Sequence, residues 1–477
     1  MSAARRRALA LSIDHGGDLR RTALQARLAT LLSALGAQGP PDAPTVDLLH
    51  GVESVLANGE MDRTWLALAV LTGRLPDDAT VERTARAVRL DGPLAALGTA
   101  LLRRGGEVWP TVRVVSGHVL VDVHQSEGYL TRHLAPIWDR EHHPLFVAWT
   151  EGRDALRLLS SAERTHLLGQ DQDPDVPAGE VLVPWHCTYV LAERVTDPAR
   201  TRPLLGMLRR SGTVGALIGT GCLPLSSAEA VPAAESGGFA TMLAAAAWAD
   251  RIAATSEAAA VEYRGWRAMR GGTGLTGPGG QVVPLADEPE ATDGLPQLDD
   301  RGIPLVLCVG SSGSGGVLAA ADLLWQEGRS FCLALADAPD AAAEVEDARF
   351  TAEVVRLQGQ GRPLRALTPD QLPAAYTSAR CTVFPALHDD LAQPIAASLA
   401  ASTPVICAGY GAMGEVAAAG GALLVDPRDD DELADALRQV LTDDGLHSRL
   451  TAEARARPSH AWEQYAEQVW TYLVTPP

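Results

Sequence analysis

The stretch of residues 381–427 constrains the fold of this chain more than any other part of the sequence. It begins with a short apolar run, residues 381–384, which is typical of a buried β-strand. A polar loop follows, then a small-residue helix expected at about 394–401, and then a second apolar run at 404–407. Strand, loop, helix and strand in this order predict a parallel βαβ sheet. Because ligands of such sheets bind at the carboxyl ends of the strands, we expect a binding site in the two loops that follow these strands.

These two loops hold the acidic residues of the stretch. Asp389 and Asp390 follow the first strand, and Glu415 follows the second strand after a glycine-rich turn, at the start of another helix. Both loops therefore place acids where a ligand would bind. Two plainer interpretations stay open. The aspartates could be surface acids of a loop, and Glu415 could be an acid that the helix dipole favours near a helix N-terminus.

The same residues resemble the donor-sugar half of family-4 retaining glycosyltransferases, which have the GT-B architecture. Enzymes of that family carry two glutamates separated by seven residues, around a Gly-Phe-Gly-Leu-Pro core. Pro394 matches the proline of this motif, residues 404–406 match the strand after it, and Glu415 with Val416 matches a later acid–valine pair. The resemblance covers roughly residues 110–475. It implies an α/β fold with two Rossmann-like domains facing a cleft, and retaining sugar transfer from a nucleotide sugar without a metal cofactor.

Several positions that the family uses for its chemistry carry other residues in this chain. The first glutamate position is Asp389, and Asp390 and Leu391 follow it where the family has glycine and phenylalanine. The resemblance thus makes Asp389 and Glu415 candidate catalytic residues. The second glutamate position is Ala397, which offers no acceptor to sugar hydroxyls. The family's arginine and lysine, which hold the donor diphosphate, fall on Gly315 and Gly316. An acid at the end of a first-domain strand is replaced by Gly221. Because these changes occur together, we interpret them as a relaxed demand on catalysis.

The donor-binding candidates come from three loops of the second domain. The strand expected at 304–310 leads into a glycine-rich loop that opens a helix, and the backbone N–H groups of such a loop can hold phosphate. The alternative is a flexible turn without a ligand. The donor-binding candidates are Gly310, Ser311, Ser312, Gly313, Gly315, Gly316, Asp390, Pro394, Ala412, Met413, Gly414 and Glu415.

The acceptor-side candidates come from the first domain, where β-rich runs begin at about Val112. His186, after the strand expected at 181–184, is a candidate base or hydrogen-bond donor to an acceptor, although retaining transfer of this class needs no protein base. The loop after the strand at 118–123 is a candidate acceptor contact, and its alternative is a polar turn capped by Ser126. The acceptor-side candidates are His124, Glu127, Gly128, Trp185, His186, Thr220 and Gly221.

The order of elements predicts four parts. We expect an α-helical extension over 1–107, an acceptor-side domain over 108–285, a proline- and acid-rich linker over 286–302, and a donor-side domain with a closing helix over 303–477. We expect the helical extension to serve docking or oligomerisation rather than substrate binding. Within the donor-side domain we expect further strands at 331–335 and 354–357.

Composition excludes several classes of function. The net charge of −19 argues against a nucleic-acid partner. All 40 basic residues are arginines, so neither Schiff-base chemistry nor a lysine phosphate clamp is available. The six cysteines form no C-x-x-C pair and lie mostly in apolar runs, which indicates reduced thiols in a cytosol. The sequence contains no signal-peptide pattern and no run long enough to span a membrane, and we expect a cytoplasmic protein.

Three functional hypotheses follow. The leading one is a glycosyltransferase-like protein with a degenerate nucleotide-sugar site, a pseudoenzyme that partners an active homologue or self-associates through the helical extension. The second is an active retaining hexosyltransferase that moves a sugar to a glycan or small-molecule acceptor through Glu415, Asp389 and the amides of loop 311–316. The third is a glycan- or metabolite-binding protein that uses only the acceptor side.

Overall fold

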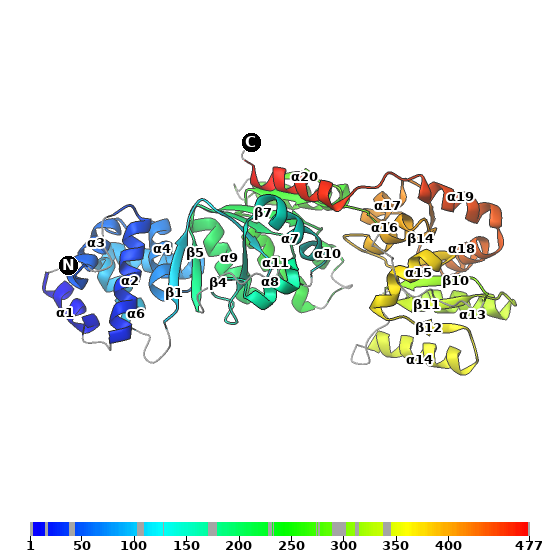
Figure 1. Ribbon diagram of the computed structural model, residues 1–477, viewed down its shortest axis with the longest axis horizontal. Coiled ribbons are helices and arrows are strands. Elements are labelled where there is room, and N and C mark those ends of the chain that lie inside the picture. Colours follow the sequence, from blue (N-terminus) through cyan, green and yellow to red (C-terminus); the bar gives the residue numbers. More distant parts are fainter. Residues whose placement is uncertain are drawn as a thin grey trace.

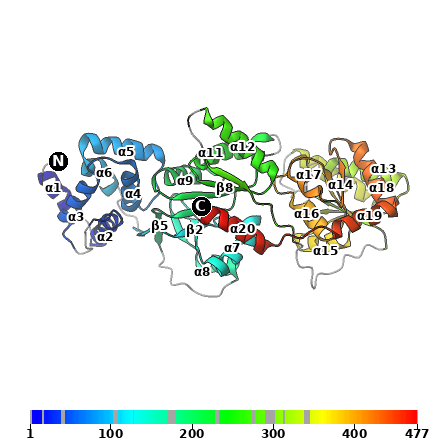
Figure 2. The ribbon, with the colours of Figure 1, turned by 90° about the horizontal axis from the view of Figure 1, so that it is seen from above.

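The computed structural model describes residues 3–14, 18–37, 43–102, 109–126, 128–169, 179–227, 231, 233–272, 274, 277–288, 302–310, 314–336 and 345–475. Three parts follow one another along the long axis of the molecule (Figure 1). They are a group of helices at the N-terminal end, a domain built on a large sheet, and a second α/β domain. The view from above shows the same order, with the last helix, α20, lying over the central domain (Figure 2).

The N-terminal part is helical because its apolar residues recur at helical spacing. Within the fourth helix, Trp65 to Leu71 are all buried, so this helix is enclosed by its neighbours on every side. It ends at Gly73, which adopts the left-handed conformation that favours glycine. The helices are α1 (Ala3–Asp14), α2 (Asp18–Ala34), α3 (Thr45–Val55), α4 (Met61–Thr72), α5 (Asp78–Asp91) and α6 (Pro93–Leu102).

The helical extension shares one hydrophobic core with the central domain. Leu28 and Leu31 of α2 belong to the same buried cluster as Val112 and Leu182 of the central sheet. Arg27 connects the two parts directly, because its guanidinium donates to the carbonyl oxygens of Leu71 (2.8 Å) and Pro110 (2.6 Å) and stacks over Trp109. The extension is therefore packed onto the central domain through a buried interface.

The central domain contains a nine-stranded sheet in the order β1-β5-β4-β3-β2-β6-β7-β8-β9. Strands β2, β3, β6, β7, β8 and β9 pair in parallel, whereas β4 is antiparallel to both of its neighbours. The strands are β1 (Thr111–Val115), β2 (Val119–Asp122), β3 (Leu145–Trp149), β4 (Leu156–Leu158), β5 (Glu180–Pro184), β6 (Thr188–Leu191), β7 (Val214–Gly219), β8 (Arg251–Ala254) and β9 (Gly279–Val282).

Helices cover the central sheet. The helices of this domain are α7 (Tyr129–His142), α8 (Ser161–Leu168), α9 (Pro198–Arg210), α10 (Leu223–Ser226), α11 (Ala233–Ala246) and α12 (Glu257–Gly271). The final helix of the chain, α20 (Trp462–Val474), also packs here, and Trp138 of α7 donates to the carbonyl of Ala466 (3.0 Å). Trp470 and Leu473 are buried in the same cluster as Trp138. By packing, the closing helix thus belongs to the central domain.

The second α/β domain has a six-stranded parallel sheet in the order β12-β11-β10-β13-β14-β15. Its strands are β10 (Leu305–Val309), β11 (Cys332–Ala336), β12 (Leu364–Ala366), β13 (Cys381–Phe384), β14 (Val405–Ala408) and β15 (Ala422–Val425). Its helices are α13 (Ser314–Gln326), α14 (Val345–Gly359), the 3₁₀ helix η2 (Pro369–Gln371), α15 (Leu372–Ser378), α16 (Gln393–Ala400), α17 (Gly411–Ala417), α18 (Asp430–Thr442) and α19 (Asp444–Arg455). The buried βαβ stretch that dominates the sequence forms β13, α16 and β14 at the middle of this domain.

One expected strand is a helix in the structure. Residues 354–357 lie within α14, and the strand of this region is β12, seven residues further on at Leu364. In α14, Leu357 is buried, Val354 is half-buried and Val355 is 62% exposed. Burial of side chains three residues apart is typical of a helix. The adjacent β-branched residues Val354 and Val355 therefore wrongly indicated a strand.

Among the helices that the structure describes, none combines the length and the apolar character needed to cross a membrane.

The contacts of Arg27 predict that it stabilises the join between the extension and the central domain. We expect Arg27→Ala to lower stability by about 3 kcal/mol, because two buried carbonyls lose a charged donor. Urea unfolding followed by circular dichroism measures this loss. The control is Arg86→Ala, which removes an exposed arginine of α5 and should change stability by less than about 0.5 kcal/mol. Equal effects of the two variants would contradict the assigned role of Arg27.

Candidate functional site

The two α/β domains meet through loops at the carboxyl ends of their parallel strands. From the central domain come the residues after β6 and β7 and the first turn of α12. From the second domain come the loops after β13 and β14, which contain Asp390 and Glu415. This is the edge at which α/β sheets bind ligands. We therefore take this interface, hereafter the interdomain cleft, as the candidate site.

Arg194 and Asp390 form an ion pair across the cleft. Arg194 lies just after β6, and its guanidinium donates to the Asp390 carboxylate and to the Thr220 hydroxyl (3.2 Å). Glu235 lies 3.6 Å from the same guanidinium. The Arg194 and Asp390 side chains are only 21% and 13% exposed. Burial raises the pKa of Asp390 to about 7, against the opposing influence of Arg194.

Gly221 makes room for the Asp390 carboxylate. A β-carbon at position 221 would overlap the Oδ1 atom of Asp390. The φ angle of Gly221 is 140°, a conformation that other residues rarely adopt. Two positions at which the sequence departs from the family pattern, one in each domain, are thus in direct contact. Glu262 and Tyr263 of α12 hold the same turn, since Glu262 accepts from the Cys222 amide and Tyr263 donates to the Gly221 carbonyl.

Asp389 points back onto its own loop. Its Oδ1 atom accepts from the backbone amides of Leu391 (3.0 Å) and Ala392. Burial raises the pKa of Asp389, and these amide bonds oppose that shift. Ala392, which occupies a glycine position of the family motif, adopts the left-handed conformation with a φ of 51°. Asp389 therefore stabilises a strained turn at the start of α16. This role occupies one of the two carboxylate oxygens of Asp389.

Glu415 binds the start of a helix in the other domain. It is the fifth residue of α17, so it does not lie in the first turn of its own helix. Instead, its two carboxylate oxygens accept from the backbone amides of Glu257 (2.8 Å) and Ala258 (2.5 Å), the first residues of α12. These amides have no partner within their helix, and the helix dipole favours a negative charge there. The sequence placed Glu415 at the start of its own helix, whereas the helix N-terminus that it contacts belongs to α12, which is distant in sequence.

The glycine-rich loop of the second domain carries no basic side chain at its two family positions. Gly315 and Gly316 lie in the first turn of α13. A β-carbon at Gly315 would meet open space, but one at Gly316 would lie 2.6 Å from the Oδ1 atom of Asp430. An acid therefore stands beside the position at which the family has a cation. Ser311, Ser312 and Gly313 lie outside the described residues.

The other donor-side candidates lie in the loops and helix starts that follow strands of the second domain. Gly310 directly follows β10 and has a φ of 93°. Pro394 is the second residue of α16, and its missing N–H suits the first turn of a helix. Ala412 and Met413 are buried and line the same small cavity as Asp389 and Asp390. Gly414 packs against the backbone of Gly409, where a β-carbon would lie 2.6 Å from the carbonyl.

A buried polar network centred on Asp122 holds the acceptor-side loop that follows β2. Asp122 accepts from Trp149 (2.9 Å), Tyr189 (2.5 Å) and Arg200 (2.8 Å) through one oxygen, and from the amide of His124 (2.9 Å) through the other. Burial lowers the pKa of His124, which favours its neutral form. The network orders the loop that bears His124 at the carboxyl edge of the sheet.

Gly128 is explained by packing. It caps the N-terminus of α7, and a β-carbon there would overlap the Glu193 carboxylate. Glu193 accepts from the amide of Thr131 (2.8 Å), so this acid, rather than Ser126, caps the helix. Glu127 lies outside the described residues. Thr220 lines the cleft beside Asp390.

The structure does not bring Trp185 and His186 to the cleft. They lie in the short connection that precedes β6, and the amide of His186 donates to the carbonyl of Ser211, just before β7. They are thus at the amino ends of strands whose carboxyl ends face the cleft, and β7 separates His186 from Gly221. Trp185 is buried in the core, and His186 is exposed with a φ of 52°. The sequence indicated that these two residues follow a strand. The edge of the sheet at which they lie, however, depends on how the strands pair.

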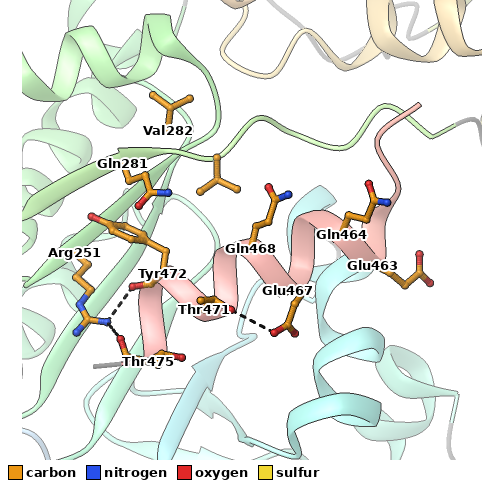
Figure 3. Close-up of a pocket in the computed structure, with 11 residues that line it drawn as sticks. Arg251, Gln281, Val282, Glu463, Gln464, Glu467, Gln468, Thr471, Tyr472 and Thr475 are labelled. Atoms are coloured by element: carbon orange, nitrogen blue, oxygen red, sulfur yellow. Dashed lines mark hydrogen bonds between the residues drawn. The ribbon is translucent and has the colours of Figure 1, made fainter. Parts of the chain in front are cut away.

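Little space remains in the cleft. The cavity there has a volume of about 70 Å³ and is lined by residues of both domains, including Thr220, Glu262, His388 and Tyr410. A larger groove of about 870 Å³ lies elsewhere, between β9 and α20. Figure 3 shows it beside the polar face of α20, with Gln464 and Gln468 directed toward the segment that follows β9. The groove contains none of the predicted site residues.

Neither Arg194 nor the role of α12 was predicted from the sequence. Arg194 follows the apolar run of β6, at the carboxyl edge of the sheet, and a charged residue directly after a buried strand is the signal that would have identified it. The two amides of α12 carry no sequence signal of their own. Ser256 caps this helix by accepting from the Ala259 amide (3.0 Å), which leaves the first two amides for Glu415.

The contact at Gly221 predicts a strong effect of a small substitution. We expect Gly221→Ala to lower stability by about 2–4 kcal/mol, from backbone strain and from overlap with Asp390. Adding Asp390→Gly should recover the part due to overlap but not the strain. Gly315→Ala, whose β-carbon meets open space, is the control and should stay within about 0.5 kcal/mol of the original protein. Differential scanning calorimetry of the four proteins provides the comparison, and a neutral Gly221→Ala would refute the contact.

Comparisons with known proteins agree with this architecture. Residues 315–457 match the family described as Glycosyl transferases group 1. A segment of 112 residues is 30% identical to O-antigen chain mannosyltransferase B of Escherichia coli, and it covers 23% of this chain and 29% of that protein. The chain therefore matches less than a third of the length of this curated relative.

Two solved structures share the fold over most of the chain. HepE of Anabaena, in complex with UDP and glucose, has a TM-score of 0.54 at 14% identity, with 75% of this chain and 99% of that chain covered. The UDP-forming α,α-trehalose-phosphate synthase of Burkholderia xenovorans has a TM-score of 0.52 at 12% identity, with 76% and 99% covered. At these identities the likeness concerns the fold, which is α/β and GT-B-like with two Rossmann-like domains.

Proposed function

We propose that this chain, whose second domain is a group 1 glycosyltransferase domain, is a glycosyltransferase-like protein with an impaired donor site that acts as a non-catalytic partner of an active homologue. The observation that carries the proposal is the use of the two candidate catalytic carboxylates. Asp389 is bound to the amides of its own loop, and Glu415 is bound to the amides that begin α12. Each of these carboxylates thus accepts hydrogen bonds from backbone amides rather than from a substrate.

Diphosphate binding is expected to be weak. Gly315 and Gly316 remove two cations from the loop that would hold it, and Asp430 adds a negative charge beside Gly316. A hydrogen bond to a charged group contributes about 1.5–3 kcal/mol, so losing two weakens binding by roughly two to four orders of magnitude. The amides at the start of α13 offset only part of this loss.

Sugar or ribose binding is expected to be weak for a separate reason. Ala397 lies in α16 at the position of the second family glutamate, and its side chain packs with the apolar cluster of the second domain. It offers no acceptor to hydroxyl groups. The cleft cavity of about 70 Å³ is far below the roughly 300–1,000 Å³ of typical ligand sites.

The second candidate function is an active retaining hexosyltransferase. Two observations favour it: the 112-residue similarity to a mannosyltransferase, and the position of Arg194, a cation from the first domain that reaches the donor loop. Such an enzyme would bind a nucleotide saturably in the cleft and would transfer its sugar to a glycan or small-molecule acceptor.

Thermal-shift titrations with UDP, GDP, dTDP and their sugars test the proposal. Ligand at 100 times its dissociation constant stabilises a protein by about 2.7 kcal/mol, which a melting curve detects readily. We expect no concentration-dependent shift with any of these compounds up to millimolar concentrations. A saturable shift with one nucleotide would favour the second function.

A turnover assay with the same nucleotide sugars gives an independent test. We expect no release of nucleoside diphosphate above the rate without protein. The informative variant is Glu415→Ala, with Glu463→Ala as a control at an exposed acid of α20. Turnover that disappears in Glu415→Ala but persists in Glu463→Ala would overturn the proposal and assign catalysis to the cleft.

A further inference from the structure

Two acidic side chains of the second domain cross the cleft and bind the first domain at separate places. Asp390, from the loop after β13, pairs with Arg194, and Glu415, in α17, binds the amides of α12. We propose that these contacts form an interdomain lock that holds the two domains closed without a bound ligand. The lock is defined by Arg194, Gly221, Asp390, Glu415 and the first two amides of α12. It concerns domain geometry, and it holds whether or not the protein transfers sugar.

Contacts within the first domain hold the side chain of Arg194 in place. Thr220 and Glu235 contact the guanidinium, and the ring of Phe239 lies 5.5 Å below it. These contacts restrict the arginine to one position and so reduce the conformational entropy lost when Asp390 binds. Gly221 leaves a space of the right size for the incoming carboxylate. The pair is mostly shielded from water, which strengthens its attraction.

The Glu415 half is chemically independent of the first. It joins a helix of each domain, whereas Arg194 and Asp390 lie in loops, and it pairs a carboxylate with backbone donors rather than with a side chain. Both oxygens are used, at 2.5 and 2.8 Å. Because α12 has 15 residues, its N-terminus carries a substantial partial positive charge. Losing one half of the lock leaves the other in place.

The segment that follows β9 is bonded to the segment that precedes α20. The amide of Asp287 donates to the carbonyl of His460 (3.1 Å), and the Asp287 carboxylate accepts from the His460 amide (2.6 Å). Glu288 accepts from the amide of Trp462 (3.3 Å). In the proposed lock these two bonded segments act as the hinge, and the contacts of Asp390 and Glu415 restrain rotation about it.

Small-angle X-ray scattering of the full chain tests the lock. The original protein should give a radius of gyration that matches the closed structure. Asp390→Ala/Glu415→Ala should give a larger value, because neither contact then opposes rotation about the hinge. The charge-matched control is Asp370→Ala/Asp431→Ala, which removes two exposed acids of the same domain and should scatter like the original protein. Far-UV circular dichroism verifies that all three proteins are folded.

Single variants separate the two halves. Glu415→Gln keeps one acceptor for the amides of α12 and should open the protein less than Glu415→Ala does. Arg194→Ala and Asp390→Ala should each produce the same opening, and combining them should add nothing, since both remove one contact. An open original protein, or a double variant Asp390→Ala/Glu415→Ala that stays closed, would overturn the lock.

Nucleotide titration of the unlocked double variant decides the proposed function separately. UDP and GDP are the probes. Scattering alone decides the lock, because it reports geometry in the absence of nucleotide. A nucleotide that binds the unlocked variant saturably would contradict the impaired donor site and leave the lock standing. Absence of binding both to the original protein, in which Asp390 and Glu415 are intact, and to the opened variant would support the impaired donor site.

Discussion

The contact between the Asp390 carboxylate and the backbone of Gly221 determines how closely the two α/β domains approach. Any side chain at position 221 would overlap the carboxylate, and the φ of 140° excludes most residues before packing is considered. The contact is buried and is completed by Arg194. Removing a carboxylate and a guanidinium from water is costly, and their mutual attraction repays that cost only in good geometry. The surrounding side chains supply that geometry, because they hold the arginine in one position within the first domain.

This constraint changes the role of the other acids in the cleft. Once the domains are in contact at Gly221, the loop after β14 lies against α12, and Glu415 reaches the two unpaired amides of that helix. Asp389 stabilises the left-handed turn at Ala392, which sets the position of Asp390 in the same loop. The acids at the carboxyl ends of these strands thus stabilise their own loop and the contact between the two domains. A ligand that used the same groups would have to compete with these contacts.

Much of the fold could be predicted because its signals are local. The apolar runs of β13 and β14, with a small-residue helix between them, define a parallel sheet from sequence alone. Strand direction across a sheet is not local. The position of His186 depends on which strands it lies between, and the sequence gives no measure of that pairing. The cleft contacts are the least local, since Arg194 and Asp390 are 196 residues apart. Side chains at strand ends predicted residues that lie at the interdomain cleft, but not the residues that they contact there.

Two of the positions that we interpret as departures from the family pattern lie against acids. Gly221 accommodates Asp390, at a position where the resemblance expects glycine. Gly316 lies beside Asp430, so a larger residue there would displace that side chain. Ala397 packs with an apolar cluster where an acid would have to be solvated. Random loss at a disused site would leave cavities and unpaired charges, because nothing would favour one replacement over another. The pair of Gly221 and Asp390 instead fills its space and brings the carboxylate to Arg194 across the two domains, as the proposed lock requires.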